Sequence, residues 1–439
     1  MVRALKMLAV ALVAVLVLAA GAYLALLLRT RALEERLVRD ANAIFGTPRS
    51  RPTHVDTPEP GTLGEALSKH LSAFRPVWRA VADDAAAMAA QDAVLFGKLG
   101  PADLPRACVD AIEGLKEDLD GVLRGARVAN ADLEVAGDPY DASPAGNWLA
   151  YQMVAFLAGA RARQALAAGN ASAALSDCLD GLGLGRDAAV SGGLIGHMIG
   201  LKCIEKLAPT CVDAMASASE ADRTDSIDRL RKIRDAVPGF EKTMREEAVA
   251  VQVTALGPML GAEFSKRLLG RARLMANGWG VPSMDERGLL RTWFERLVWR
   301  DRQEIYDELV TDSAMRGAAR NAAFATLAEK VSQRGSWIRS ELPQPLDYRH
   351  YAQRAEIGIA RLDLVVLAGA AASFRGAHGR WPRDIGELAA SGLVTALERE
   401  RNGEVRLVPS AGDALEIVTP IEKPAEDAPS EARVVVSGP

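Results

Sequence analysis

Residues 7–28, MLAVALVAVLVLAAGAYLALLL, contain no charged side chain over 22 consecutive positions. A helix needs about 20 apolar residues to cross the hydrocarbon core of a bilayer, so this stretch is long enough for one crossing. Arg3 and Lys6 precede it, and Arg29 and Arg31 follow it. The sequence therefore predicts a transmembrane helix over residues 7–28, with the lipid bilayer as its partner.

A cleaved signal peptide is the main alternative for this stretch. Ala20-Gly21-Ala22 has the small-x-small pattern of a cleavage site. Residues 23–28 (YLALLL) stay apolar beyond that site, whereas a mature chain normally becomes polar there. We therefore expect an uncleaved anchor.

The orientation of the anchor depends on its flanks and on the length of the body. Two basic residues lie in residues 1–6 and four in residues 29–39, a count that taken alone favours a cytoplasmic body. However, a tail of six residues has little to translocate, and long domains cross a membrane largely regardless of their charge. The many Arg and Ala residues are typical of a GC-rich bacterial genome. We expect a single-pass protein of a bacterial inner membrane with a periplasmic body; a cytoplasmic body is the alternative.

The composition is that of a globular protein, with 49% hydrophobic and 25% charged residues. The net charge of -4 and the lack of a basic tract argue against nucleic acid as a partner. Aromatic residues make up only 5% of the chain, and β-branched runs are rare before residue 400. The sequence therefore predicts the all-α class, built from helical hairpins that could repeat, with a small α+β segment at the C-terminus.

Proline and glycine indicate where this chain divides. Residues 46–64 (GTPRSRPTHVDTPEPGTLG) contain four prolines and three glycines, which is typical of a linker. Two further prolines lie in residues 340–345 and mark a second boundary. We expect seven parts: a cytoplasmic tail at 1–6, the transmembrane helix at 7–28, a stalk helix at 29–45, the linker at 46–64, a helical domain at 65–340, a long helix with a small β element at 346–424, and a tail at 425–439.

Helical periodicity is clearest in the middle of the helical domain, over residues 147–168 and 171–186. A third helix is expected over residues 191–207, where glycine recurs at every fourth position. A stripe of such small residues lets a neighbouring backbone approach closely. We predict close helix packing at three positions: Gly192, Gly196 and Gly200.

The chain has four cysteines: Cys108, Cys178, Cys203 and Cys211. They permit two disulfides in three connectivities. An oxidising compartment would favour pairing, whereas the cytosol would leave them as small core residues. If residues 171–207 form a hairpin, Cys178 and Cys203 lie almost equally far from its turn, which a disulfide requires. Cys178–Cys203 is the candidate disulfide, beside the other connectivities and the absence of any.

The polar and glycine-rich motifs do not match a known catalytic or cofactor signature. Residues 181–185 (GLGLG) lack the G-x-G-x-x-G spacing and a preceding strand, so we interpret them as a loose helix end. His197 lies on an apolar helix, which favours a packed core histidine over a catalytic base. We interpret the carboxylate clusters around residues 113–120 and 301–308 as solvated faces. We therefore expect no cofactor, no metal and no catalytic residue.

The C-terminal third contains a long helix over residues 348–375, followed by the sequence HGRWP. Gly379 can end that helix, Trp381 can fill the corner, Pro382 can start the next helix, and Leu388 would face inward. Short strands are expected afterwards at three places: 405–408, 415–418 and 434–436.

This motif resembles the Y-x-x-x-x-G-x-[WY]-P-x-x-L-x-x-L segment that follows the long helix of type II secretion pseudopilins. The likeness spans residues from about 350 to 420, and the start of the chain (MVRALKML) lacks the pseudopilin processing motif. More loosely, most of the chain is similar to uncharacterised, membrane-anchored, Ala/Leu-rich helical proteins of the bacterial envelope.

These features lead to one main functional hypothesis and two alternatives. The main hypothesis is a single-pass envelope protein without catalytic activity, whose helical body is a scaffold that binds another protein. The first alternative is an envelope enzyme with an unrecognised site in a helical cavity. The second is an accessory protein of secretion or pilus assembly, which only the C-terminal motif suggests.

Overall fold

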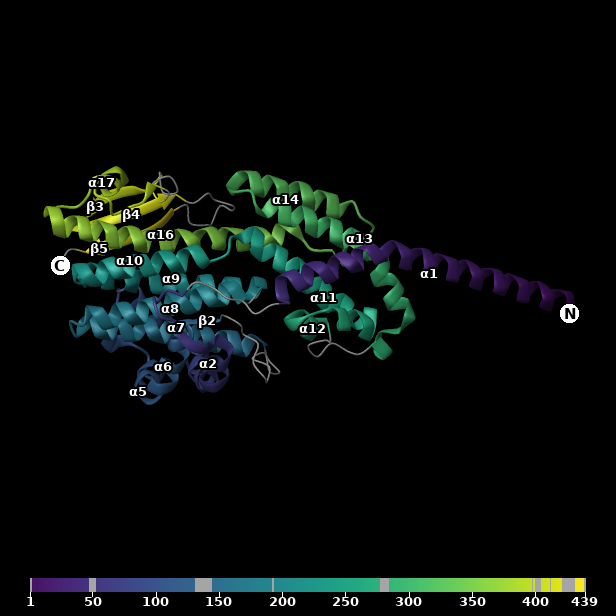
Figure 1. Cartoon of the computed structure of the whole chain (residues 1–439), viewed down its shortest axis with the longest axis horizontal. Coiled ribbons are helices and arrows are strands. Elements are labelled where there is room, and N and C mark those ends of the chain that lie inside the picture. The colour runs from purple at the N-terminus through teal and green to yellow at the C-terminus, as the bar shows by residue number, and fades with distance from the viewer. Residues whose placement is uncertain are drawn as a thin grey trace. The chain divides into compact units, whose positions relative to one another are not determined.

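The computed structural model describes residues 2–46, 53–130, 144–191, 193–276, 284–340, 342–396, 398, 404–410, 412–420 and 431–437. It is mostly helical, with a small sheet near the C-terminus, in outline the predicted fold class (Figure 1). The chain forms two compact units: unit 1 is Met1–Pro48 with Met244–Tyr348, and unit 2 is Arg49–Thr243 with Arg349–Pro439. The expected helical domain at 65–340 is therefore shared between both units and is not one domain.

Unit 1 is a group of helices that includes the N-terminal helix. Its elements are α1 (Val2–Phe45), most of α11 (Phe240–Arg267), α12 (Gly270–Ala276), α13 (Met284–Ser313), α14 (Gly317–Ser332), α15 (Ser336–Arg339) and the 3-10 turn η3 (Pro345–Asp347). Within this unit, α1 lies against α12 and α13.

The second half of α1 is a core helix and not the predicted stalk. Leu37, Ala41 and Phe45 recur every fourth residue and so share one face of the helix. They pack into a buried cluster with apolar residues of α11 and α12, among them Val253 of α11 and Ala272 of α12. The periodicity at 29–45 shows an apolar face, but the residues that cover it lie more than 200 positions further along the chain.

Unit 2 contains the remaining elements. In order they are β1 (Glu59–Thr62), α2 (Leu63–His70), η1 (Leu71–Phe74), α3 (Arg75–Ala82), α4 (Ala85–Leu95), η2 (Pro101–Asp103), α5 (Arg106–Gly114), α6 (Lys116–Gly125), β2 (Val128–Asn130), α7 (Pro144–Ala167), α8 (Ala171–Ser191), α9 (Gly193–Ser217), α10 (Glu220–Ala236), α16 (Tyr348–His378), α17 (Ile385–Ala390), β3 (Arg406–Ser410), β4 (Ala414–Pro420) and β5 (Glu431–Ser437).

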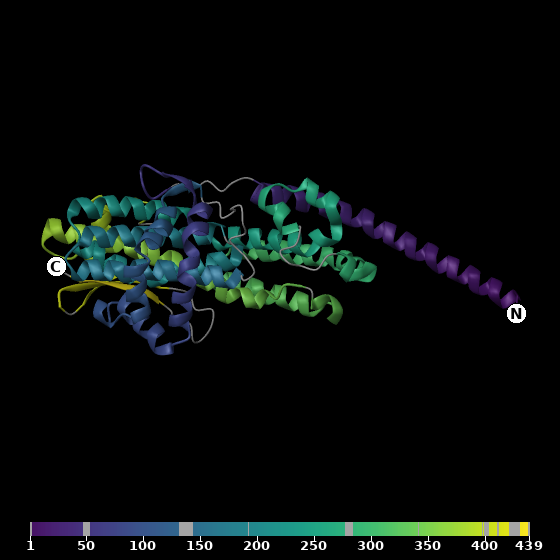
Figure 2. The same ribbon diagram turned by 90° about the horizontal axis from the view of Figure 1, so that it is seen from below.

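Helices α7, α8 and α9 pack side by side at the centre of unit 2 (Figures 1 and 2). A Cβ added at Gly200 would lie 2.1 Å from the carbonyl oxygen of Gly185, and one at Gly196 would lie 2.6 Å from that of Ala188. Both glycines thus stand where α8 and α9 approach each other closely. Gly192 lies outside the described residues.

The glycine-rich sequence at 181–185 lies inside α8, so its interpretation as a loose helix end is wrong. Each glycine of this run allows a neighbour to approach. Gly181 faces Leu207, Gly183 faces His54, and Gly185 faces the backbone of α9. The cost of glycine in a helix is about 0.5–1 kcal/mol per residue, and tight packing offsets it here.

Within the predicted linker at 46–64, residues 53–64 pack against the body of unit 2. Thr53 and His54 are buried, and Glu59–Thr62 forms strand β1, which pairs in parallel with β2. Thr62 then caps α2, since its hydroxyl accepts from the Glu65 N–H while the Glu65 carboxylate accepts from the Thr62 N–H. The prolines indicate a segment without helix, but they do not show that it packs against the body.

The C-terminal sheet is antiparallel, in the order β3-β4-β5. Its central strand β4 buries Leu415 and Ile417, and Ile417 pairs with Val434 of β5. Residues 431–437 form the third strand, which contains the short strand predicted at 434–436, so the segment expected as a tail at 425–439 includes a strand of the sheet. The alternation of buried and exposed residues along β5 is the pattern of a strand with one covered face.

The C-terminal motif forms a corner between α16 and α17. Gly379 has a φ of +70°, the left-handed conformation that ends a helix. The Trp381 ring N–H donates to the Asp413 carbonyl at 3.2 Å, and Leu388 is fully buried. Pro382 does not start the next helix, because α17 begins only at Ile385, where the preceding Asp384 provides the cap.

Candidate functional site

Two helices of the described chain are long and apolar enough to cross a membrane, by length and composition alone. Pro345–His378, which includes α16, has a mean hydropathy of 1.7, and 78% of its most apolar stretch is buried in the protein. Val10–Phe45, which is part of α1, has a mean hydropathy of 2.7, but only 6% of its most apolar stretch is buried. The exposed apolar half of α1 is therefore the candidate membrane segment.

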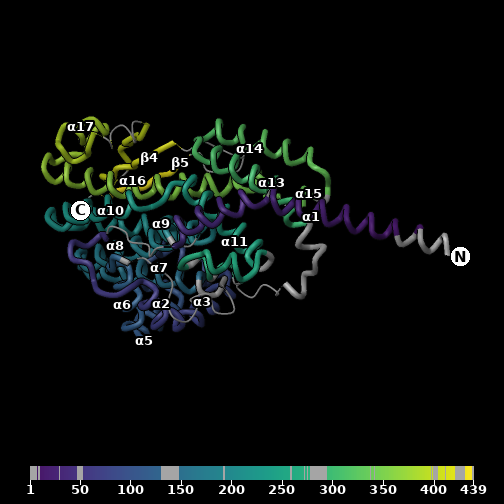
Figure 3. The backbone as a smooth tube through the Cα atoms, turned by 45° about the vertical axis from the view of Figure 1, so that its right-hand side comes forward, coloured from purple at the N-terminus to yellow at the C-terminus, as the bar shows by residue number. Residues whose placement is uncertain are grey.

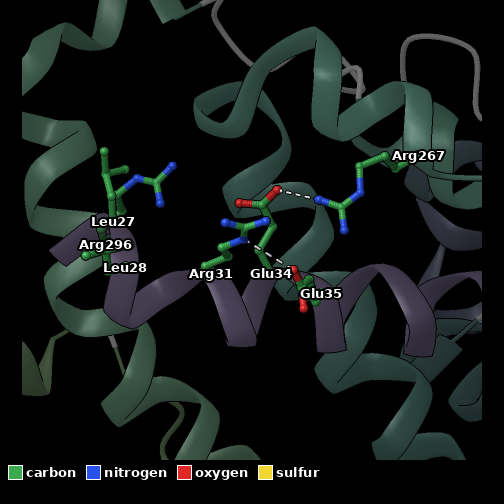
Figure 4. Close-up of a pocket in the computed structure, with 7 residues that line it drawn as sticks. All are labelled: Leu27, Leu28, Arg31, Glu34, Glu35, Arg267 and Arg296. Carbon is green, nitrogen blue, oxygen red and sulfur yellow. Dashed lines mark hydrogen bonds and ion pairs between the residues drawn. The ribbon is translucent and has the colours of Figure 1, made fainter. Parts of the chain in front are cut away.

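A pocket of about 510 Å³ lies in unit 1 where this apolar stretch ends (Figure 4). Leu27 and Leu28 form its apolar side. The remaining lining residues are charged: Arg31, Glu34, Glu35, Arg267 and Arg296. The pocket thus combines an aliphatic surface with three guanidinium groups and two carboxylates.

The arginines of this pocket come from three helices, α1, α11 and α13, which Figure 3 labels along the backbone. Figure 4 draws their side chains. Arg267 donates to the Glu34 carboxylate at 2.9 Å, and Arg31 donates to that of Glu35 at 3.4 Å. Arg296 donates from Nη1 to the Thr30 hydroxyl at 2.8 Å. Three arginines against two glutamates leave one positive charge in excess.

The end of α11, where Arg267 lies, is hydrogen-bonded to the end of α1. The Asn42 amide donates to the Arg267 carbonyl at 2.9 Å and accepts from the Leu269 N–H at 2.8 Å. Gly270 has a φ of +46°, and a Cβ there would lie 2.7 Å from the Phe45 carbonyl oxygen. The position of Arg267 beside α1 therefore depends on contacts that a larger residue at 270 would break.

A second polar cluster lies inside unit 2, around Asp180 of α8. His54 Nε2 lies 2.8 Å from an Asp180 oxygen, and Arg127 donates from Nε to the same carboxylate at 3.0 Å. Burial lowers the pKa of His54. Burial opposes ionisation of Asp180, but hydrogen bonds with His54 and Arg127 bring its pKa below the ordinary value. A neutral His54 therefore donates to a charged Asp180.

This histidine–aspartate pair has the composition of a general base with its orienting acid. However, His54 is fully buried, and a Cβ at Gly183 would lie only 3.0 Å from its Cε1 atom. The ring thus packs directly on α8, with no room for a substrate. We interpret the pair as a structural hydrogen bond that attaches residues 53–54 to the central helix α8. A lone histidine in a proline-rich stretch gave no signal of this contact.

A third polar cluster joins α10, α16 and the segment after α17. Arg234 donates to Asp363 at 3.2 Å and to Glu398 at 2.9 Å, and all three side chains are buried. Burial raises the pKa of Glu398, but hydrogen bonds from Arg231, the Thr395 N–H and Arg234 bring it down to about 2. These charges neutralise one another, so the cluster is suited to stabilising unit 2.

The remaining sequence candidates are buried in unit 2. His197 is fully buried, and burial lowers its pKa to about 4, which keeps the ring neutral. The four cysteines are free and buried, so the Cys178–Cys203 disulfide is not formed in the structure. Burial raises the pKa of the Cys178 thiol.

No protein family, curated protein or solved structure matches this chain. The likeness of residues 350–420 to pseudopilins therefore stays a prediction.

Proposed function

We propose that this protein is a single-pass, membrane-anchored helical scaffold of the bacterial envelope, which binds a protein partner beside the inner membrane. The exposed apolar half of α1 is the observation that carries the proposal. Val13, Leu16 and Leu18 each expose more than half of their surface. Exposed apolar residues in an unbroken run are costly in water and favourable in lipid.

The proposal gains support from how α1 continues. The same helix runs from the apolar half into the core of unit 1, where Leu37, Ala41 and Phe45 are buried. An anchor of this kind holds its bundle next to the bilayer without a flexible spacer. The buried charged clusters in unit 2 are already neutralised by their own partners, which fits a structural role better than catalysis.

Membrane flotation of the full chain tests the anchor. Replacing Val13 and Leu16 together by Arg should release the protein from vesicles, because each charge at a helix centre costs about 2.5–3.5 kcal/mol of insertion free energy. Val435→Arg places a charge on an exposed position of β5 and serves as the control. Wild-type protein that stays soluble in the absence of detergent and does not float would contradict the proposal.

The side of the membrane and the scaffold role have separate tests. Proteinase K added to spheroplasts should degrade the body if it is periplasmic and leave it intact if it is cytoplasmic. Thiol alkylation is a poor reporter here, because all four cysteines are buried. A purified full chain that turns over small molecules but captures no envelope protein would overturn the scaffold assignment.

A further inference from the structure

The pocket of unit 1 lies where the apolar stretch of α1 gives way to charge. Leu27 and Leu28 are the last residues of the uncharged run, and Arg31 follows one turn later. At 1.5 Å per residue, a run of this length measures about 33 Å, close to the ~30 Å hydrocarbon thickness of a bilayer. If α1 spans a membrane, as the proposed function states, the pocket lies at the depth of the lipid headgroups.

Arg31 and Arg296 have unused capacity for an anionic ligand. The contact of Arg31 with Glu35 is 3.4 Å long, and both side chains are more than half exposed, so this ion pair is weak. Arg296 hydrogen-bonds to the neutral Thr30, and no carboxylate of the described residues pairs with it. Its Nε is buried and has no hydrogen-bond partner within that same described part of the chain.

Arg267 and Glu34 differ from these two residues, because they satisfy each other at 2.9 Å. The positive charge of Arg267 and the negative charge of Glu34 therefore cancel each other within the pocket. The single surplus positive charge of the pocket then belongs to Arg31 and Arg296, of which Arg296 lies beside Leu27 and Leu28 (Figure 4). Guanidinium groups bind phosphate oxygens through paired hydrogen bonds, and leucine side chains suit the first carbons of an acyl chain.

We propose that this pocket binds the phosphodiester headgroup of an anionic phospholipid. Arg31 and Arg296 donate to the phosphate, while Leu27 and Leu28 contact the adjoining acyl carbons. The surplus charge of the pocket matches the single negative charge of a phosphatidylglycerol headgroup. A zwitterionic headgroup brings its own cation and gains less from the arginines.

Lipid retention by the full-length protein tests this assignment. The chain is reconstituted into vesicles of phosphatidylglycerol and phosphatidylcholine in equal amounts, extracted, and weighed intact with its bound lipids by native mass spectrometry. Wild type should retain phosphatidylglycerol in excess. Arg31→Gln should lower that excess about fivefold, and adding Arg296→Gln should lower it about fivefold again. Arg31 is mostly exposed, so its replacement leaves the fold intact.

Arg39→Gln is the matched control, since Arg39 is an exposed arginine of α1 outside the pocket. It should leave the lipid ratio unchanged. Equal loss in Arg39→Gln and Arg31→Gln, or equal retention of both lipids by wild type, would overturn the inference. Displacement of the lipid by inorganic phosphate would assign the site to a free anion and would also overturn it. Failure of wild type to float with vesicles contradicts the proposed function itself, whereas flotation without lipid preference contradicts only this inference.

Discussion

Helices α1 and α16 are both long and apolar enough to cross a membrane, but they differ in their surroundings. The most apolar stretch of α16 is 78% buried in protein, whereas that of α1 is only 6% buried. The sequence of α16 contains Arg361 and Asp363 near its middle, whereas residues 7–28 of α1 have no charge at all. Asp363 forms an ion pair with Arg234 on α10, and such a partner is available only inside a folded unit. The comparison shows that a charge paired within its own folded unit, such as that of Asp363, identifies an apolar helix as part of a protein core.

Placing an arginine in each helix should give the largest difference between them. Leu364 of α16 is fully buried, so Leu364→Arg buries an unpaired charge and should destabilise unit 2 by about 4 kcal/mol or more. Leu16→Arg in α1 should leave the stability of unit 2 unchanged and weaken membrane insertion by about 3 kcal/mol. Hydrogen exchange in unit 2 at increasing urea concentration measures the change in stability. Vesicle flotation measures the change in membrane insertion. Equal destabilisation of unit 2 by both variants would remove the distinction.

The charged cluster around α16 should make unit 2 sensitive to acid. The pKa of Glu398 is about 2 in the folded protein against 4.5 for the free side chain. Because the folded value is the lower one, its stabilisation is complete above pH 4.5 and is lost as the pH falls towards 2. The shift corresponds to about 3 kcal/mol.

Glu398→Gln tests this dependence directly. The variant should be less stable than wild type at neutral pH by about 3 kcal/mol, and its stability should change less between pH 5 and pH 2. Chemical unfolding at several pH values measures both quantities. Parallel pH profiles for wild type and variant would show that other carboxyl groups cause the acid sensitivity.

Replacing one glycine by alanine in each helix should give the smallest difference in stability between variants of α16 and α1. A Cβ at Gly358 of α16 would lie 2.4 Å from a methyl group of Leu201 and 3.1 Å from its Cβ. Gly358→Ala should therefore destabilise unit 2 by about 1–3 kcal/mol. Gly21 of α1 has no atom within 4 Å of such a Cβ, so Gly21→Ala should not lower stability. Thermal unfolding compares the two, and a loss in Gly21→Ala would place protein against the exposed half of α1.

Much of the helical order was predictable because local periodicity reflects which face of a helix is covered. The expected helix at 147–168 corresponds to α7, Pro144–Ala167, and the long helix expected at 348–375 corresponds to α16. The expected strands at 405–408 and 415–418 lie within or next to β3 and β4. Such elements bury residues that recur at a fixed spacing, and a single sequence is enough to reveal that spacing.

The candidate site could not be predicted in the same way. The lining of the pocket combines residues near position 30 with Arg267 and Arg296, and no local pattern links them. The contact between His54 and Asp180 spans 126 positions and was missed for the same reason. The glycines at 181–185 were misinterpreted because glycine opposes helix formation locally, while the close approach of α9 that favours it is visible only in three dimensions.

By itself, the sequence determined the helical class, most helix positions and the apolar run at residues 7–28. These features depend on the spacing and hydrophobicity of residues near one another in the chain. Only the tertiary structure decided that residues 37–45 continue this run as a core helix, that α16 is enclosed by its own unit, and that arginines from three helices meet beside Leu27 and Leu28. Burial and charge pairing depend on partners far away in sequence, and folding alone brings those partners together.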